Sequence, residues 1–132
     1  MRFYTDVFGA KEMMRMNDPS GKIGHADLQI GESHFMLCDE SPEMGAKSPE
    51  AFGGSPVAIY LYVEDVDEVW DRAMKAGATQ VEAVDDLFYG DRAGRLKDPF
   101  GHTWWIATRK ENVPPEELSR RAAEMYEGQP AS

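Results

Sequence analysis

The feature that most constrains the fold of this chain is an internal repeat. Two short amphipathic segments each end in a glycine followed by an alanine, at Gly9 and at Gly77. Three extended stretches separated by turns follow each glycine, and the interval from Gly9 to Gly31 is only two residues shorter than that from Gly77 to Gly101. A glycine directly after the last helical residue is typical of a helix C-terminus. The sequence therefore predicts a duplicated unit of one helix followed by three strands.

Hydrophobic periodicity and turn residues give the expected bounds of each unit. The first unit should contain a helix at Arg2–Phe8 and strands at Glu12–Met16, His25–Ile30 and Ser33–Cys38. The second should contain a helix at Asp65–Ala76 and strands at Gln80–Val84, Asp91–Lys97 and Thr103–Thr108. Its last two strands are separated by Asp98-Pro99-Phe100-Gly101, which fits a type I turn because Asp, Pro and Gly occupy the first, second and fourth positions.

The two predicted units differ at their N-terminal ends. The second unit has a strand before its helix, at Pro56–Val63, whereas only Met1 precedes the helix of the first. By internal symmetry the first unit lacks one strand. A chain that begins downstream of an N-terminal segment and a true seven-strand variant both explain this pattern. In both cases an unpaired strand edge is left, which invites pairing with another chain or disorder.

A single domain is expected, because 132 residues, of which 42% are hydrophobic, suffice for one core. We divide it into the first unit at residues 1–38, a linker at 39–55, the second unit at 56–110 and a tail at 111–132. The linker is rich in Pro, Gly and Ser and has no periodicity, and a helix is predicted after the Pro114-Pro115 pair in the tail.

Charge and cysteine content narrow the range of partners. The net charge is -10, which argues against nucleic acid or an anionic membrane as a partner because both need a basic surface. No apolar run approaches the roughly 20 residues of a membrane-spanning helix, and no signal peptide is evident. The single Cys38 excludes an intrachain disulfide and suits a reducing compartment. We therefore expect a soluble cytoplasmic protein with a small-molecule partner.

Several motifs together resemble one family. They are Ile23–Gly31, Met36–Glu40, Gly53–Pro56, Tyr89–Arg92 and Asp98–Trp104. With the duplicated units, they resemble the vicinal oxygen chelate superfamily, and within it the PhnB-like branch of the glyoxalase and bleomycin-resistance proteins, over residues 3–121. The resemblance implies an α+β fold in which two βαβββ modules form a curled, half-open mixed sheet, here without the first strand of the first module. It also implies a homodimer with a small-molecule cavity on the concave face.

The resemblance also raises the question of a divalent metal cofactor, because metalloenzymes of this family bind the ion with one residue from each of four strands. Carried over to this sequence, three of those positions fall at Phe35, near Ala58 and at Trp105, and the fourth lies on the missing strand. These side chains lack the carboxylate or imidazole donors that such cations need. A shift of one residue leaves only His34 able to bind. We therefore predict no metal site and no cofactor.

Strand parity predicts which side chains line the concave face. The aliphatic residues Val57, Ile59, Leu61 and Val63 should pack on the helices. The predicted ligand-binding residues are His25, Asp27, Gln29, Phe35, Tyr60, Tyr62, Tyr89, Arg92 and Trp105. An aromatic wall with a few polar groups is typical of a small-molecule pocket, although the same aromatic residues would also fill a barrel or a dimer interface.

Two questions stay open from the sequence. Arg92 could anchor an anionic ligand group or pair with Asp85 or Asp86. The function could be metal-free binding of a planar or cationic small molecule, which we favour. It could instead be a metal-dependent lyase, isomerase or dioxygenase of the glyoxalase type, using His25 with Asp27 or Glu40. A third alternative is metal-free acid–base catalysis by His25, oriented by Asp27, with Tyr60 or Tyr62. No catalytic residue is assigned.

Overall fold

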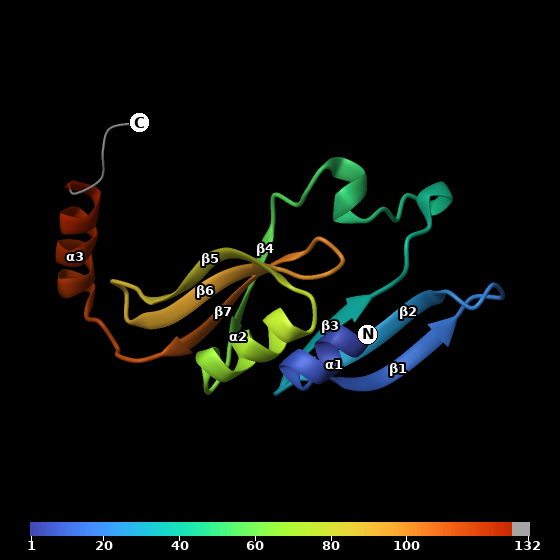
Figure 1. Cartoon of the computed structure of the whole chain (residues 1–132), viewed down its shortest axis with the longest axis horizontal. Helices are drawn as coiled ribbons and strands as arrows, with labels where there is room; N and C mark the ends of the chain where they lie inside the picture. The colour runs from blue at the N-terminus through green and yellow to red at the C-terminus, as the bar shows by residue number, and fades with distance from the viewer. Residues whose placement is uncertain (128–132) are drawn as a thin grey trace.

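The computed structural model describes residues 1–127 of the chain and shows an α+β fold (Figure 1). The α-helices are α1 (Arg2–Phe8), α2 (Val66–Lys75) and α3 (Pro115–Glu127), and two short 3-10 helices are η1 (Pro42–Met44) and η2 (Pro49–Phe52). The strands are β1 (Lys11–Asn17), β2 (Ile23–Ile30), β3 (Ser33–Leu37), β4 (Ala58–Tyr62), β5 (Thr79–Asp86), β6 (Asp91–Lys97) and β7 (Thr103–Arg109). The predicted elements are confirmed, with bounds that differ by one or two residues at most ends.

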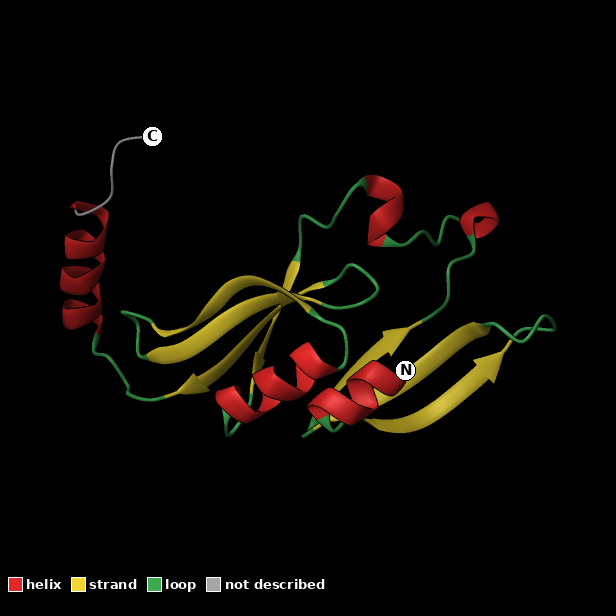
Figure 2. Ribbon diagram, viewed as in Figure 1, coloured by secondary structure: helices red, strands yellow, loops and turns green. Residues whose placement is uncertain are grey.

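Two sheets repeat one arrangement (Figure 2). The first sheet has the order β1-β2-β3 and is antiparallel. The second has the order β4-β7-β6-β5, in which β4 runs parallel to β7 and the other pairs are antiparallel. Strands β2 and β3 therefore correspond to β6 and β7, and the strand that would correspond to β4 is the one missing from the first module. The predicted duplication is confirmed, and among residues 1–127 the first sheet has three strands whereas the second has four.

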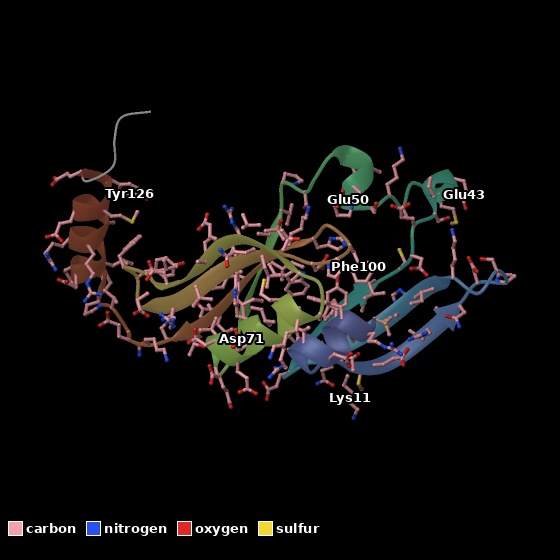
Figure 3. All side chains as sticks on the ribbon, viewed as in Figure 1. Lys11, Glu43, Glu50, Asp71, Phe100 and Tyr126 are labelled. Carbon is pink, nitrogen blue, oxygen red and sulfur yellow. The ribbon has the colours of Figure 1, made fainter. Side chains whose placement is uncertain are left out.

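The linker between the modules contains two short helices that the sequence did not predict, whereas the helix of the tail was predicted. Both 3-10 helices lie in the predicted linker, and η2 lies close to the β6–β7 turn, since a Cβ added to Gly101 would lie 2.7 Å from Glu50 Oε1. Figure 3 shows Glu50 and Phe100 at the same end of the second sheet. The predicted tail helix is α3, and the last part of the predicted tail, residues 128–132, lies outside the described residues. Among residues 1–127, no helix is long and apolar enough to cross a membrane.

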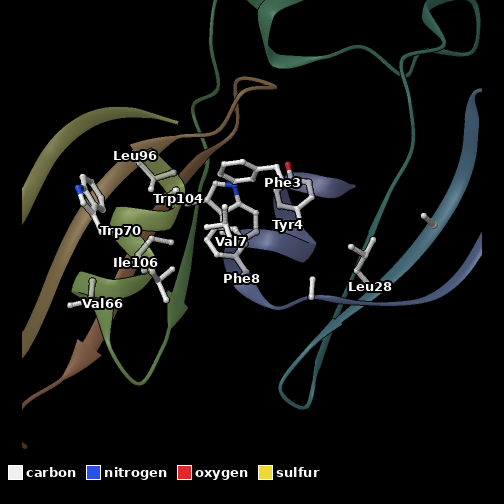
Figure 4. Close-up of a cluster of buried hydrophobic side chains, with 14 residues drawn as sticks. Phe3, Tyr4, Val7, Phe8, Leu28, Val66, Trp70, Leu96, Trp104 and Ile106 are labelled. Atoms are coloured by element: carbon white, nitrogen blue, oxygen red, sulfur yellow. The ribbon is translucent and has the colours of Figure 1, made fainter. Parts of the chain in front are cut away.

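The core lies where the two helices of the modules meet the sheets. Helices α1 and α2 lie side by side, each in front of the sheet of its own module in Figure 1, and Figure 4 shows their apolar side chains gathered near Leu96, Trp104 and Ile106 of the second sheet. Helix α2 buries one stripe at helical spacing because its apolar residues recur on one side. The members of that stripe are Val66, Val69, Trp70 and Ala73. From the strands, Leu28, Leu96, Trp104 and Ile106 complete the cluster.

One part of the predicted core is wrong. Leu61 and Val63 do pack against the buried cluster, but Val57 is 66% exposed and Ile59 is 44% exposed. Val57 precedes the paired part of β4, and Ile59 lies beside the open edge of the first sheet, so no helix covers either side chain. Alternation along a strand assigns a side chain to a face, but it does not show how far the covering helices extend.

Candidate functional site

The face of the second sheet that points away from the helices carries aromatic and charged side chains. Residues directly opposite each other on neighbouring strands point to the same side. The register pairs Trp105 with both Tyr60 and Arg95, and it pairs Asp91 with Arg109. We call this surface the open face, and its members are Tyr60, Tyr62, Asp91, Arg95, Trp105 and Arg109. The adjacent strand positions Trp104 and Ile106 point the other way and are buried against the helices.

Three aromatic rings form a continuous row along the open face. The ring centroids of Tyr60 and Trp105 are 6.0 Å apart with an interplanar angle of 20°, and those of Tyr60 and Tyr62 are 5.2 Å apart. The guanidinium carbon of Arg95 lies 5.3 Å from the Trp105 ring centroid, and that of Arg109 lies 5.5 Å from the Tyr62 centroid. These distances are within the range of cation–π attraction. The aromatic row is therefore bounded by a positive charge at each end.

The carboxylate of Asp91 links the two tyrosines of this row to Arg109. Its side chain is fully buried, and the Tyr60 and Tyr62 hydroxyls each donate a hydrogen bond of 2.8 Å to Oδ2. Arg109 Nε donates to Oδ1 at 2.5 Å. Burial opposes ionisation, but the hydrogen bonds from Tyr62, Tyr60 and Arg109 outweigh it, so the pKa of Asp91 lies below its ordinary value. Asp91 is therefore an ionised anchor at neutral pH.

A third tyrosine extends the cluster from the turn between β5 and β6. The hydroxyls of Tyr60 and Tyr89 are 3.0 Å apart, and since Tyr60 donates to Asp91, Tyr89 is the donor of this bond. Burial, followed by the hydrogen bonds to Tyr89 and Asp91, raises the pKa of Tyr60 above its ordinary value. A tyrosine that stays protonated does not serve as a general base at neutral pH. The raised pKa therefore argues against Tyr60 as a general base.

The predicted residues on β2 form a separate group on the first sheet. His25, Asp27 and Gln29 are half-buried on the face opposite Ala26 and Leu28, as predicted from parity. Asp27, however, pairs with His34, whose Nδ1 lies 2.9 Å from Asp27 Oδ1. Asp27 therefore orients His34, and not His25 as the acid–base alternative required. By register, three exposed methionines share this face, namely Met14, Met16 and Met36.

Phe35 was predicted on the concave face, and this placement is wrong. It lies opposite Leu28 in the β2–β3 ladder, on the side that faces the helices. Its ring packs edge-on against Tyr4, at a centroid distance of 5.5 Å, and against Trp104, at 6.0 Å. The prediction placed the wrong residue because it took β3 one position out of phase with β2. His34 is the residue that shares the face of Asp27.

Arg92 was considered as an anion anchor, and it lies on the helix-facing side of β6 instead. Its guanidinium donates to Asp67 at 3.0 Å and to Asp86 at 3.3 Å. Adjacent residues of a strand point to opposite faces, so Asp91 on the open face places Arg92 behind it. The hydrogen bonds to Asp67 and then Asp86 raise the pKa of Arg92. Of the two alternatives from the sequence, the structural pairing with Asp86 is confirmed.

Three members of the open face were missed from the sequence, and a signal for them existed. Asp91, Arg95 and Arg109 have the same parity as the inward-facing positions of their own strands. Side chains alternate along β7, so Arg109 points to the same face as Trp105. In the antiparallel pairing of β6 with β7, Asp91 lies opposite Arg109 and Arg95 lies opposite Trp105, which places both on this face. Tyr60, Tyr62 and Trp105 were predicted on this face and lie together on it, and the hydroxyl of Tyr89, from the β5–β6 turn, lies 3.0 Å from that of Tyr60.

The residues at the positions that would hold a divalent metal do not fit one. With β3 in its observed register, His34 replaces Phe35 at the first of these positions and could supply one imidazole nitrogen, but Ala58 and Trp105 supply no donor atom. Within residues 1–127, no group of three or more His, Cys, Asp or Glu side chains is arranged to hold a metal ion. We therefore derive no chemistry through a metal at these positions.

The duplicated helix-and-strand unit and the aromatic, charged open face define a two-module α+β protein with an open sheet surface. A family model described as the Glyoxalase/Bleomycin resistance protein/Dioxygenase superfamily matches residues 1–106. The chain belongs to this superfamily, and the fold implied by the sequence resemblance is confirmed.

Individual relatives agree with this assignment. An uncharacterized protein of Mycobacterium bovis is 42% identical over 129 residues, which cover 96% of this chain and 85% of the relative. The X-ray structure of an Arabidopsis thaliana gene product is 30% identical, has a TM-score of 0.64, and the match covers 80% of this chain and 82% of that one. A structure from Bacillus cereus, described as a putative 3-demethylubiquinone-9 3-methyltransferase, PhnB protein, has a TM-score of 0.62 over 82% of this chain and 86% of that one. Its identity is 18%, so that likeness shows the fold alone.

Proposed function

We propose that this protein binds a small planar organic molecule on the open face without a metal ion. The observation that carries the proposal is the buried Asp91 carboxylate, which fixes the Tyr60 and Tyr62 hydroxyls and Arg109 beneath an exposed aromatic row. Tyr60 and Tyr62 remain 39% and 51% exposed although their hydroxyls are held. Aromatic side chains that are fixed at one end and remain partly exposed offer a rigid apolar contact surface.

The charges around the aromatic row favour a neutral or anionic ligand over a cationic one. Arg95 and Arg109, which also pair with Glu82 and Asp91, already occupy the cation–π positions over Trp105 and Tyr62, so a planar cation would have to displace them to gain the same contacts. Arg95 also has a buried Nε with no hydrogen-bond partner among the described residues. An acceptor group beside Trp105 would give this donor a partner after a small side-chain movement. We therefore narrow the planar or cationic class considered from the sequence to planar neutral or anionic molecules.

We further propose that the protein acts as a homodimer that covers this surface. Large apolar side chains are exposed on both sheets, on the open face and among the methionines Met14, Met16 and Met36. Soluble monomers rarely expose contiguous apolar patches of large size. A second copy placed over the open face would enclose the ligand and supply the opposite wall. Sedimentation velocity should give a dimer at micromolar concentration, and a strict monomer that still binds ligand with full affinity would contradict this arrangement.

The experiment for ligand binding uses three probes with one ring system and different charge. These are 2-naphthol, 2-naphthoate and 2-naphthylmethylammonium, titrated by calorimetry into the full chain. We expect the neutral and anionic probes to bind more tightly than the cation. Trp105→Leu should weaken binding by roughly threefold to tenfold, because loss of a stacked aromatic partner costs about 0.5–1.5 kcal/mol.

A matched control separates the open face from aromatic content in general. Phe52 is 71% exposed in the linker, so Phe52→Leu removes an exposed ring without touching the open face. Equal loss of binding in both variants, or no binding of any probe, would contradict the proposal. The metal-dependent alternative is tested by elemental analysis of protein purified without chelator. A divalent ion at one equivalent per chain would favour that alternative.

A further inference from the structure

The two ends of the aromatic row differ in how their positive charges are compensated. At one end Arg109 pairs with Asp91, whose side chain is fully buried and also accepts two tyrosine hydroxyls. At the other end Arg95 pairs with Glu82, whose side chain is 51% exposed. An exposed pair of this kind contributes little, so another anion can replace the carboxylate at low cost. The Nε atom of Arg95 is buried and has no hydrogen-bond partner among the described residues. An anionic ligand therefore meets an unused donor at the Arg95 end of the row.

Lys97 adds a second positive charge at the Arg95 end. It lies two residues after Arg95 on β6, so alternation places both side chains on the open face. The register pairs Lys97 with Thr103 on β7. None of the ion pairs within residues 1–127 includes Lys97. One positive charge is therefore left uncompensated at this end of the row, whereas the charges at the other end cancel.

Short side chains lie beside the aromatic row at this end. Ala58 and Thr103 are opposite each other in the β4–β7 ladder, and each lies two residues before an aromatic member of the row. Alternation therefore places both on the open face. The Tyr60 hydroxyl donates to Asp91 at the opposite end, so the tyrosine ring is directed away from them. A group attached to the edge of a ring that contacts Trp105 would therefore meet the Thr103 hydroxyl and the neighbouring ammonium group instead of another aromatic ring.

We propose that the open face binds planar aromatic carboxylates in one orientation, with the ring on the aromatic row and the carboxylate between Arg95 and Lys97. This inference rests on the proposed function and narrows its planar neutral or anionic molecules to aromatic acids. A carboxylate attached to an aromatic ring lies near the plane of that ring, so a ring in contact with Trp105 directs the carboxylate along the sheet to the next row of side chains. There Arg95 offers a fork of N–H donors and Lys97 a point charge. Glu82 releases Arg95 when the ligand binds.

The test compares 2-naphthoate with 2-naphthol, which share a ring system and differ in charge, by calorimetry on the full chain. Lys97→Gln should raise the Kd of 2-naphthoate by roughly fivefold to tenfold, because one charge-assisted contact is lost, and should leave that of 2-naphthol within about twofold. Lys97→Arg keeps the charge and should leave both values within about twofold. Glu82→Gln should lower the Kd of 2-naphthoate by roughly twofold or more, because Arg95 loses its competing partner.

Lys75→Gln is the matched control for the charge. Lys75 is the last residue of α2, on the helix side of the sheet, and it is exposed. The substitution makes the same chemical change and should leave both affinities within about twofold, because salt at about 0.15 M screens a charge beyond roughly 8 Å.

The outcomes separate this inference from the proposed function. Equal weakening of the two probes by Lys97→Gln, or equal weakening of 2-naphthoate by Lys97→Gln and Lys75→Gln, overturns the carboxylate position while the open face remains a binding surface. If Lys97→Gln does not fold, judged by circular dichroism, Glu82→Gln decides, and an unchanged or weaker affinity for 2-naphthoate overturns the inference. Binding of neither probe to the unmodified protein overturns both proposals.

Discussion

Tyr4 and Asp98, which are 94 positions apart in the chain, form a buried hydrogen bond between the two modules. The Tyr4 hydroxyl of α1 donates to Asp98 Oδ2 at 2.5 Å, and Trp104 Nε1 donates to the same oxygen at 2.9 Å. The other oxygen, Oδ1, accepts from the backbone N–H groups of Phe100 and His102. One carboxylate therefore closes the β6–β7 turn and attaches the first helix to it. Burial, followed by the hydrogen bond to Asp98, raises the pKa of Tyr4.

Replacing Tyr4 by Phe should lower the free energy of unfolding by about 1–3 kcal/mol, because Asp98 Oδ2 loses one of its two donors in a buried site. Urea unfolding followed by tryptophan fluorescence measures the change. Tyr126→Phe is the matched control, since Tyr126 is 65% exposed and its loss of a hydroxyl should change the stability by less than about 0.5 kcal/mol. Equal stability of Tyr4→Phe and the unmodified protein would show that the two modules do not depend on this bond.

The Asp98 turn shows what local sequence predicts and what it does not. Asp18-Pro-Ser-Gly21 and Asp98-Pro-Phe-Gly101 share the same turn residues, and in both turns the Asp side chain accepts backbone N–H groups within the turn. Both turns follow from the short-range pattern. Asp18 is exposed, however, whereas Asp98 is buried beneath Tyr4. That difference depends on the packing of α1, which no short stretch of sequence encodes.

The candidate site was predictable to a similar extent. Alternation placed Tyr60, Tyr62 and Trp105 on one face, because strand periodicity is local. Phe35 was misplaced because its face depends on the register between β2 and β3, and a slip of one residue reverses every side chain. The hydrogen bonds of Asp91 to residues on β4 and β7 could not be predicted, because they depend on the order of the strands in the sheet, and local sequence patterns do not give that order.

Asp91→Asn should change the pH dependence of stability. The folded-state pKa of Asp91 is below its ordinary value, so ionised Asp91 contributes stability above the unfolded pKa of about 3.9. That contribution is lost as pH falls through the folded pKa. At pH 7 the variant should be less stable by about 1–3 kcal/mol. Chemical unfolding from pH 3 to 7 should show this difference shrinking at the acid end; a difference that stays constant over this range would contradict the assignment.

Arg92, which the sequence predicted as a ligand-binding residue, and Arg109, which it missed, should differ in their effect on ligand binding. Arg109 contacts Asp91 and Tyr62 on the open face, whereas Arg92 contacts Asp67 and Asp86 on the helix side. Arg109→Gln should weaken 2-naphthoate binding by roughly tenfold, since one charge-assisted contact is lost and the Tyr62 ring is released. Arg92→Gln makes the same chemical change and should leave the affinity within about twofold, because ion pairs of this exposed kind contribute little. Calorimetry on both variants makes the comparison, and the reverse order would restore Arg92 as the anion anchor.

Gly94 permits close packing between β6 and α2, and its replacement should destabilise the second module. A Cβ at this position would lie 2.7 Å from Trp70 Cζ3 and 2.9 Å from Val84 Cγ2, and both atoms belong to side chains in or against the core. Gly94→Ala should therefore cost about 1–3 kcal/mol through overpacking. Gly24→Ala is the control, because its Cβ would meet only Met16 O at 3.4 Å and neither glycine has a positive φ. Trp70 is 8% exposed, so its fluorescence should shift to the red if the helix moves away from the sheet. If Gly94→Ala is as stable as Gly24→Ala, then α2 can move away from β6 at little cost and does not hold the sheet that carries the open face.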